Sequence, residues 1–551
     1  MRLLRYPGFP SFRYNGITKF TIIMKFPILS LATALLIAPI FTSCGSDDPF
    51  EDSFKPNPNN PSGGGGTDNP SGGGGTDNPS GGGGTSSSSY NELYRPQIHY
   101  TPAKNWVNDP NGMVYIDGTW HLFYQYNPYG NGWGNMSWGH ATSTDLVHWT
   151  EQPTALVPDA LGDIFSGSAV YDADNTGGFG KGAMVAFYTA AGAHQQQALA
   201  YSTDGGKTFT KYDGNPIIAN TTRGDFRDPK VFWHAESKRW VMSLALGWEY
   251  GIQFWTSTDL RTWREASTFT TEVGRCKRGQ WECPDLLRMN YNGQEKWVLI
   301  VSVNPGGPVI GSGTMYFVGN FDGEKFTADD LSYPLWLDYG LDNYAGVTWS
   351  NTPDGRIILI GWMNNWSYSG DVPCDPWRSA FTLPRELSLV DYQGKPVLAS
   401  RPVKELDKLA SDWSTLATSG GSINAPSAYR LQLTLDATVA NTISLGNSKK
   451  EAYEITYSPS AGSIIARRNS KTGAATFNGS YSIPSVSGSL CCEGNDLVLD
   501  IYVDQSSVEI FTGNGSMAIT NLVFPTTIYD QVTLSQPAKE VRYQAYTSIW
   551  K

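Results

Sequence analysis

Residues 143–149 read Ser143-Thr144-Asp145-Leu146-Val147-His148-Trp149, a polar turn closed by an aromatic residue. Related segments are Ser202-Thr203-Asp204-Gly205-Gly206 leading to Phe209, Ser257-Thr258-Asp259-Leu260 leading to Trp263, and Phe321-Asp322-Gly323 leading to Phe326. The four aspartates lie 59, 55 and 63 residues apart. A turn repeated at this period is typical of the outer hairpins of β-propeller blades. The interval from about residue 95 to 405 has room for five such blades.

The segments around these turns have the composition of β-strands. Short β-branched and aromatic runs alternate with Gly, Asn and Asp, as in 113–116, 120–126, 183–188, 240–245 and 297–303. No long run with a helical period of 3.6 residues occurs, so the pattern predicts an all-β protein. A three-domain β protein is the alternative, but the regular spacing of the turns favours a propeller.

The character of the sequence changes after Leu406. Tryptophans become rare, and apolar and polar residues alternate cleanly, as in Leu431-Gln432-Leu433-Thr434-Leu435. This alternation is typical of a β-sandwich with one solvated face. We therefore expect a five-bladed β-propeller catalytic domain in residues 90–405 and a β-sandwich in residues 406–551.

The N-terminus has the features of an export signal. An apolar run at 26–41 follows Lys25 and is short for a membrane span, which predicts a signal peptide in residues 1–43. Translation from Met24 would give the usual spacing. The segment Phe41-Thr42-Ser43-Cys44 resembles a bacterial lipobox, so we expect lipidation of Cys44. The following Gly45-Ser46-Asp47-Asp48 resembles the export tag of surface lipoproteins in the Bacteroidetes, which predicts an anchor on the outer cell surface; a periplasm-facing lipoprotein and a plain secreted protein are the alternatives.

Residues 44–89 are predicted to be a flexible linker. Pro61, Pro70 and Pro79 each open the segment Pro-Ser-Gly-Gly-Gly-Gly-Thr, and four serines follow at 86–89. Such a composition cannot bury a core, so the expected role is to hold the catalytic domain away from a membrane.

Charge and composition narrow the class of partner. The net charge of −11 argues against nucleic acid and against an anionic membrane surface, so we expect membrane contact only through the lipid anchor. Aromatic residues make up 13% of the chain, which fits stacking on sugar rings, although most of them are expected in the core. The cysteine spacing matches no metal site, and His140 and His148 lack a third ligand, so no metal and no cofactor are predicted. His140 is expected to be a structural turn residue. The oligomeric state stays open.

Three acidic residues are the candidates for catalysis. Asp109 lies in Trp106-Val107-Asn108-Asp109-Pro110-Asn111-Gly112, Asp228 in Phe226-Arg227-Asp228-Pro229, and Glu282 in Trp281-Glu282-Cys283-Pro284. Asp-Pro and Asn-Gly are also ordinary turn formers. An apolar setting such as that of Glu282 raises the pKa of a carboxyl toward the value that a general acid needs.

These motifs, in this order, resemble glycoside hydrolase family 32, the invertases, inulinases and levanases. The resemblance extends over nearly the whole chain after the linker, through Tyr124-Gln125-Tyr126-Asn127-Pro128, Trp133–His140, Phe165-Ser166-Gly167-Ser168, Asp338-Tyr339-Gly340, Gly361-Trp362-Met363, Ser507-Val508-Glu509-Ile510-Phe511 and Phe524-Pro525. It implies the same propeller and sandwich, and a retaining mechanism. Asp109 would be the nucleophile, Glu282 the acid/base and Asp228 a transition-state stabiliser, with the carboxyls of Asp109 and Glu282 about 5–5.5 Å apart.

The resemblance also implies a pocket for fructose. Matching positions are Asn108, Gln125, Trp133, Phe165, Ser166, Arg227 and Trp362, and Trp106 lies beside them. Packing at the propeller's centre is the alternative role for Trp106, Trp133 and Trp362. The expected substrate is levan, inulin or a fructo-oligosaccharide, with sucrose as a further option. A fructosyltransferase and a non-catalytic glycan-binding propeller are the rival functions, and exo and endo action both stay open.

Overall fold

The structure is a computed structural model that describes residues 90–550 apart from 272–273, 331–335, 469–471, 474–476, 489–491 and 493. The expected signal peptide (1–43), the lipidation site Cys44 and the linker (44–89) lie outside the described residues. Within the described ranges, no helix has the length and apolar composition needed to cross a membrane. Regular structure is almost entirely β-strand, with short 3-10 turns as the helical segments, which confirms the all-β class.

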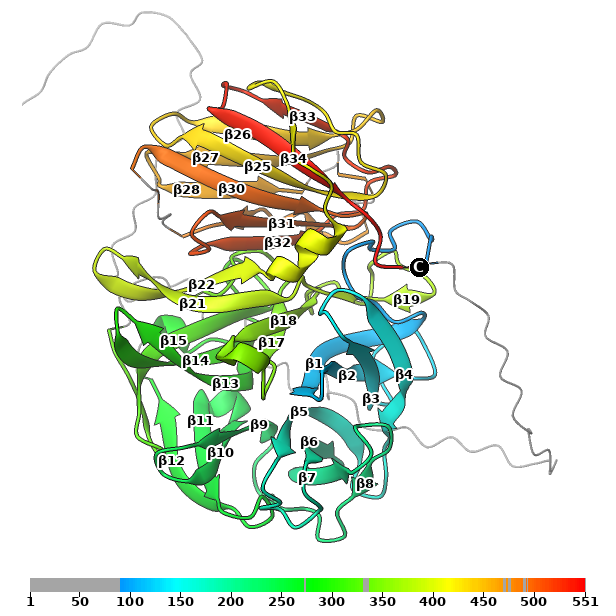
Figure 1. Ribbon diagram of the computed structural model, residues 1–551, viewed down its shortest axis with the longest axis vertical. Coiled ribbons are helices and arrows are strands. Elements are labelled where there is room, and N and C mark those ends of the chain that lie inside the picture. The colour runs from blue at the N-terminus through cyan, green and yellow to red at the C-terminus, as the bar shows by residue number, and fades with distance from the viewer. Residues whose placement is uncertain are drawn as a thin grey trace, which may run out of the picture. The chain divides into compact units, whose positions relative to one another are not determined.

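Five sheets, in which consecutive strands pair in antiparallel fashion, follow one another between residues 105 and 402 (Figure 1). The first contains β1 (Asn105–Ile116), β2 (Thr119–Asn127), β3 (Ser137–Ser143) and β4 (Trp149–Leu156). The second contains β5 (Asp163–Asp172), β6 (Ala183–Ala191), β7 (Gln195–Ser202) and β8 (Thr210–Lys211). The third contains β9 (Arg227–His234), β10 (Arg239–Ala245), β11 (Gly251–Ser257) and β12 (Arg264–Thr270), with the turn η2 (Gly247–Glu249) after β10.

The remaining two sheets complete the propeller. The fourth contains β13 (Gln280–Tyr291), β14 (Gln294–Asn304), β15 (Gly313–Phe321) and β16 (Phe326–Ala328), preceded by η3 (Gly274–Cys276). The fifth contains β17 (Tyr344–Thr348), β18 (Ile358–Met363), β21 (Arg385–Tyr392) and β22 (Lys395–Pro402), with η4 (Pro353–Gly355) after β17 and β20 (Ala380–Phe381) paired to β18. The first strand of each sheet contacts those of its neighbours, and β17 contacts β1, so the predicted ring of five blades is confirmed.

The repeated aspartates occupy the hairpins between the third and fourth strands of the first four blades. Asp145 Oδ1 accepts hydrogen bonds from the N–H groups of Val147 and His148 at 3.1 and 2.9 Å. Asp204, Asp259 and Asp322 accept equivalent bonds in the next three blades. The aromatic residue that closes each turn packs into a core between two blades, as seen for Trp149, Phe209, Trp263 and Phe326. The repeat therefore marks the blade edge, as the sequence pattern indicates.

A short strand joins the end of the propeller to its beginning. β19 (Trp377–Arg378) leaves the fifth blade and pairs in parallel with β1, where Asn105 lies opposite Trp377. The Trp377 ring is itself covered by the guanidinium of Arg95, whose Cζ lies 3.6 Å from the ring centroid. The first blade is thus built from both ends of the propeller sequence.

The C-terminal part is a sandwich of two six-stranded sheets, reached through η5 (Lys404–Leu409). One sheet has the order β23 (Ser414–Thr415), β34 (Glu540–Tyr546), β25 (Ala428–Asp436), β30 (Asp496–Val503), β31 (Ser507–Thr512), β32 (Ala518–Leu522). The other has the order β24 (Gly420–Ser422), β33 (Gln531–Leu534), β26 (Asn441–Gly446), β27 (Ala452–Ser458), β28 (Ser463–Arg467), β29 (Ser485–Val486), with η6 (Ser480–Ser482) before the last strand. The alternating leucines 431, 433 and 435 point into its core, as the sequence pattern predicts.

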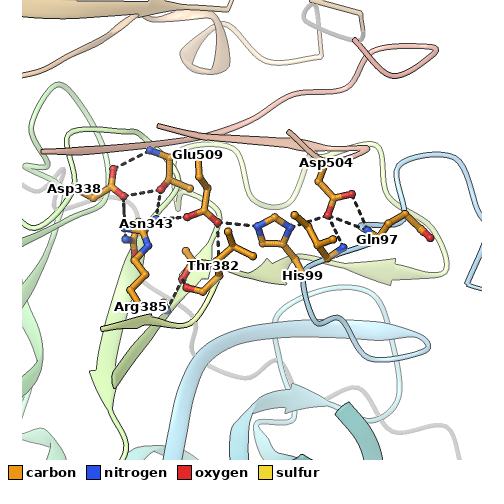
Figure 2. Close-up of polar contacts among 12 residues, drawn as sticks. Gln97, His99, Asp338, Asn343, Thr382, Arg385, Asp504 and Glu509 are labelled. Carbon is orange, nitrogen blue, oxygen red and sulfur yellow. Dashed lines mark hydrogen bonds and ion pairs between the residues drawn. The ribbon is translucent and has the colours of Figure 1, made fainter. Parts of the chain in front are cut away.

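Buried charges connect the sandwich to the propeller (Figure 2). Arg385, in β21 of the last blade, donates hydrogen bonds to Asp338 Oδ2 at 2.8 Å and to Glu509 Oε2 of the sandwich at 2.5 Å. His99, just before β1, lies between Asp504 Oδ2 at 2.7 Å and Glu509 Oε1 at 2.8 Å. All five side chains are shielded from water, so removing one of them would leave a buried charge without a partner.

Candidate active site

All five innermost strands share one irregularity. In each blade, two residues of the first strand face a single residue of the second, which is a β-bulge. The bulged pairs are 108–109, 165–166, 228–229, 283–284 and 345–346. Side chains normally alternate between the two faces of a strand, and a bulge changes the direction of the side chains it contains. The five bulges therefore direct these residues toward the centre of the ring of strands.

The backbone is unusual at three of these bulges. Asp228, Cys283 and Ala345 have φ angles of 65°, 46° and 52°, in the left-handed region that residues with a side chain seldom adopt. They occupy the same bulge position in the third, fourth and fifth blades. Strained backbone of this kind persists where the surrounding fold determines it, and functional sites are a common location.

Asp109 is the acidic side chain of the first bulge. Ser166 Oγ, from the second bulge, donates a hydrogen bond to Asp109 Oδ2 at 2.7 Å. Asn108 Nδ2 donates to Asp109 Oδ1 at 3.1 Å. Both donors stabilise the ionised form of Asp109, which is the form that can act as a nucleophile.

Glu282 is the last paired residue before the fourth bulge, and its two oxygens have different partners. Arg227 Nη2 donates to Glu282 Oε1 at 2.6 Å. The Tyr344 hydroxyl donates to Glu282 Oε2. Arg227 and Tyr344 are themselves the last paired residues before the third and fifth bulges. The three side chains meet because they hold equivalent positions in three consecutive blades.

Asp228 completes the group of acids, with Cys283 between it and Asp109. The Cys283 backbone N–H donates to Asp228 Oδ2 at 2.9 Å. The Cys283 Sγ lies 3.6 Å from Asp228 Oδ2 and also 3.6 Å from Asp109 Oδ2. Burial, together with the charges of the surrounding carboxylates, raises the pKa of the Cys283 thiol well above its usual value, so it is neutral and can donate weakly to either acid.

The proximity of the carboxyls affects the ionisation of Asp109 and Asp228. Burial raises the pKa of Asp109, and the charge of Glu282 raises it further, against the hydrogen bonds from Ser166 and Asn108. Burial raises the pKa of Asp228 to about 7; Arg227 opposes this shift, whereas Glu282 and Asp109 add to it. Burial opposes the charge of Arg227, but the neighbouring carboxylates raise its pKa, so it stays protonated. Asp228 is therefore partly protonated near neutral pH, beside a guanidinium that stays charged.

The acids open into a cavity of about 350 Å³. Its lining consists of Asn108, Asp109, Gln125, Trp133, Phe165, Ser166, Arg227, Asp228, Glu282 and Trp366. Nine of these were predicted from the sequence, and the fold brings them together from the first four blades. The Gln125 amide is fixed by hydrogen bonds to Asn111 Oδ1 and to the carbonyl of Ile164, both at 2.9 Å. Trp133 is 54% exposed and packs edge-on against Phe165, which places an aromatic surface at the cavity mouth.

Trp106 and Trp362, which the sequence offered either for the pocket or for packing at the propeller's centre, do not appear in the lining of the cavity. Both are buried within the propeller core. Trp366 covers them, with ring centroids 5.9 Å from Trp106 and 4.8 Å from Trp362, and presents its own side chain to the cavity. The Trp106 Nε1 donates to Asn108 Oδ1 at 2.8 Å, so Trp106 orients a lining residue instead of lining the cavity.

Two further residues were missed or misplaced. Tyr344 was missed, although it touches Glu282, because no motif surrounds it. His140 lies inside strand β3 rather than in a turn; it stacks on Phe123 at 4.1 Å and lies 3.1 Å from His121 Nδ1. Among the residues that the structure describes, no group of three or more His, Cys, Asp and Glu side chains is arranged to hold a metal ion.

Comparison with known proteins extends over both domains. The description "Glycosyl hydrolases family 32 N-terminal domain" matches residues 99–402, and "Glycosyl hydrolases family 32 C terminal" matches residues 402–551. The levanase of Bacillus subtilis (strain 168) is 44% identical over 461 residues, covering 80% of this chain and 68% of the levanase. An extracellular exo-inulinase of Aspergillus niger is 39% identical over 494 residues, covering 80% of this chain and 91% of the inulinase. The crystal structure of exo-inulinase from Aspergillus awamori superposes with a TM-score of 0.78 at 35% identity, over 84% of this chain and 100% of that one.

Proposed function

This chain belongs to glycosyl hydrolases family 32, and on that premise we propose that it hydrolyses the β-fructofuranosidic bonds of a fructan with retention of configuration. The observation that supports this most directly is the cavity itself, in which Asp109, Asp228 and Glu282 meet beside a single guanidinium. A paired nucleophile and acid is the arrangement that a double displacement requires.

In the first step, Asp109 attacks the anomeric C2 of the fructosyl unit. A covalent bond forms between its carboxylate oxygen and C2 while the bond from C2 to the leaving oxygen breaks. Glu282 gives its proton to that leaving oxygen, so the leaving chain departs as a neutral alcohol. In the second step, Glu282 takes a proton from water, which attacks C2 and releases Asp109.

The other lining residues have distinct proposed roles. Asp228, in its ionised form, stabilises positive charge on the ring and binds fructose hydroxyls; its position beside Arg227, with Oδ2 3.8 Å from Nε, supports this role. Asn108, Gln125, Ser166 and Arg227 offer polar groups to the sugar, and Trp133, Phe165 and Trp366 offer aromatic faces. Polar groups fix orientation while apolar surface supplies contact area.

We propose levan or inulin as the substrate, attacked from the chain end. The similarity to a levanase and to exo-inulinases supports a polymer substrate, and similarity to the exo-inulinases supports exo action. Chromatography of early products from levan and from inulin tests this. Fructose alone is the expected product. A ladder of oligosaccharides would indicate endo cleavage, and products longer than the substrate would indicate a fructosyltransferase.

Retention has its own test. Two displacements at C2 release fructose first as the β-anomer, and NMR spectra recorded before mutarotation report which anomer appears. Initial release of the α-anomer would contradict the proposed roles of Asp109 and Glu282.

For location, we propose a protein anchored to the outer cell surface by lipid on Cys44. The lipobox-like segment before Cys44 supports the anchor, and the similarity to extracellular exo-inulinases supports export. Surface display suits a polymer that is too large to import.

A further inference from the structure

Trp248 is an exposed tryptophan on a turn whose backbone is fixed by hydrogen bonds. It lies in η2, and 53% of its surface is exposed. The turn around it is well fixed: the Glu249 N–H donates to the Leu246 carbonyl at 2.7 Å, and Leu246 is buried beneath it. The Glu249 carboxylate pairs with Arg223 at 2.5 Å. An exposed indole on an anchored turn offers a large apolar face at small entropic cost to a ligand.

The turn is built directly onto the wall of the catalytic cavity. Ala245, at the end of β10, pairs with Arg227. Gly247 packs against Asp225 so closely that a Cβ there would lie 2.5 Å from the Asp225 Cβ and 3.3 Å from Gln280 Nε2. Asp225 in turn accepts a hydrogen bond from Arg227 at 2.5 Å, and Gln280 begins the strand that carries Glu282. The turn that carries Trp248 therefore adjoins the wall formed by Arg227 and Glu282.

This is the side of the cavity on which the leaving group departs, because Glu282 is the residue that protonates the leaving oxygen. Trp133 and Phe165 lie on the other side, since Phe165 is next to Ser166, the hydrogen-bond donor to Asp109. Trp248 is not among the residues that line the cavity, so the sugar next to the cleaved bond does not reach it. A longer leaving chain is needed to reach it.

We propose that Trp248 is a platform for the leaving part of a fructan chain, binding a fructosyl unit beyond the one next to the cleaved bond. The proposal rests on the proposed fructan hydrolase function. The indole face packs against the C–H groups of a furanose ring, and the exposed charged groups of Arg223 and Glu249 lie within the same turn region for its hydroxyls. Sucrose has a single leaving sugar and does not reach this platform.

The test compares a long fructan with sucrose for wild type and Trp248→Ala. The expected result is a fall of about tenfold in kcat/KM on the polymer, carried mainly by a rise in KM, with sucrose hydrolysis unchanged within about twofold. Trp248→Phe keeps an aromatic face and should retain most of the polymer activity. Trp233→Ala is the matched control, because Trp233 belongs to the same blade, is 44% exposed and lines a different cavity.

Two outcomes would overturn the platform. One is an equal loss on sucrose and polymer in Trp248→Ala, which would mean damage to Arg227 or to the fold. The other is an unchanged kcat/KM on the polymer. Retardation of the same variants in a levan- or inulin-containing native gel measures binding without turnover, and Trp248→Ala should migrate faster than wild type. A wild-type enzyme that hydrolyses no fructan overturns the proposed function itself. If the wild type is active and Trp248→Ala has the same kcat/KM on the polymer, only the platform is overturned.

Discussion

Arg227 and Glu282 hold equivalent positions in adjacent blades, each directly before a bulge, and their side chains meet at 2.6 Å. Tyr344 holds that position in the next blade and reaches the other oxygen of Glu282. Each oxygen of the proposed acid/base therefore accepts a hydrogen bond from a side chain that directly precedes a bulge in a neighbouring blade. Five copies of one bulge, carrying different side chains, make most of the site.

Asp109→Asn removes the attacking charge but keeps the shape of the side chain. Turnover on levan or inulin should fall by about four orders of magnitude, because no covalent intermediate can form. Ser166→Ala, which removes one hydrogen-bond donor to Asp109, should cost far less. Steady-state rates and circular dichroism of both variants provide the check. Near-normal activity in a folded Asp109→Asn enzyme contradicts the assignment.

Glu282→Gln should lower turnover of natural fructans by about a thousandfold, because their leaving oxygens need a proton. A substrate with an activated leaving group needs no such proton and should still form the intermediate quickly. Its hydrolysis then lacks a general base, so rapid-mixing experiments should show a burst followed by a slow steady state. Equal losses on both substrates without a burst would exclude Glu282 as the acid/base.

Asp228→Asn should lower the activity but raise the stability of the protein. The pKa of Asp228 rises from 3.8 to about 7 on folding, so ionising this group in the folded state opposes folding increasingly as pH rises across that range. The neutral amide removes this effect while its oxygen can still accept the Cys283 N–H. We expect the variant to lose most activity yet to melt at a higher temperature than wild type, by a margin that grows from pH 4 to pH 7. A lower melting temperature at pH 7 would refute this.

His99 should make the domain junction pH-dependent. Hydrogen bonds and charges from Asp504 and Glu509 outweigh burial and raise the pKa of His99 from 6.5 to about 9. Protonated His99 contributes on the order of 3 kcal/mol to the free energy of unfolding. This contribution is fully present below pH 6.5 and is lost as the pH rises through about 9. Denaturant titrations should show wild-type stability falling across that range, and His99→Asn should show a flatter profile.

The matched control for this titration is His121→Asn. Burial lowers the pKa of His121 to about 4, so His121 is neutral above pH 6.5 and the variant should keep the wild-type slope there.

At low pH, the ionisation of Glu509 sets a second limit on the stability of the domain junction. The pKa of Glu509 is lowered from 4.5 to about 2, although burial opposes this, because Arg385 and His99 stabilise its charge. Its contribution is present above pH 4.5 and is lost as pH falls through about 2, so the junction should be strongest between pH 4.5 and 6.5.

Cys44→Ala should release the protein from the membrane fraction, because the lipid anchor would be lost. Fractionation of cells followed by immunoblotting gives the result. Protease treatment of intact cells expressing wild type then separates a surface protein, which is degraded, from a periplasm-facing lipoprotein, which survives. Retention of Cys44→Ala in membranes would contradict the lipobox interpretation.

The sequence predicted the blades well because their turns are local. Asp145 and its three counterparts cap hairpins with backbone bonds to residues two to four positions away, so the signal lies within one short segment. The motif residues Asp109, Asp228 and Glu282 could be selected because short sequences surround them. Their convergence on one cavity depended on closure of the ring, which a local pattern does not contain.

The aromatic residues show where such reasoning stops. Trp362 lies within β18, opposite Tyr344, whereas Trp366 follows the strand and folds back over it. Both look alike in sequence, and only the packing decides which one meets solvent. Tyr344 and the five bulges were missed for a related reason: a shift of register by one residue exchanges the two faces of a strand, and register depends on the neighbouring strand.

The short pairing of β19 with β1 has a consequence for the order of assembly during synthesis. Asn105 and Trp106, immediately before the segment that carries Asp109, are paired on one edge with Trp377 and Arg378. On a ribosome, the first blade emerges early, but its last partner, β19, emerges only after β17 and β18 of the fifth blade have been made. A nascent chain therefore carries Asp109 long before the strand that contains it has gained its second neighbour, and the first blade is completed only while the fifth is being made.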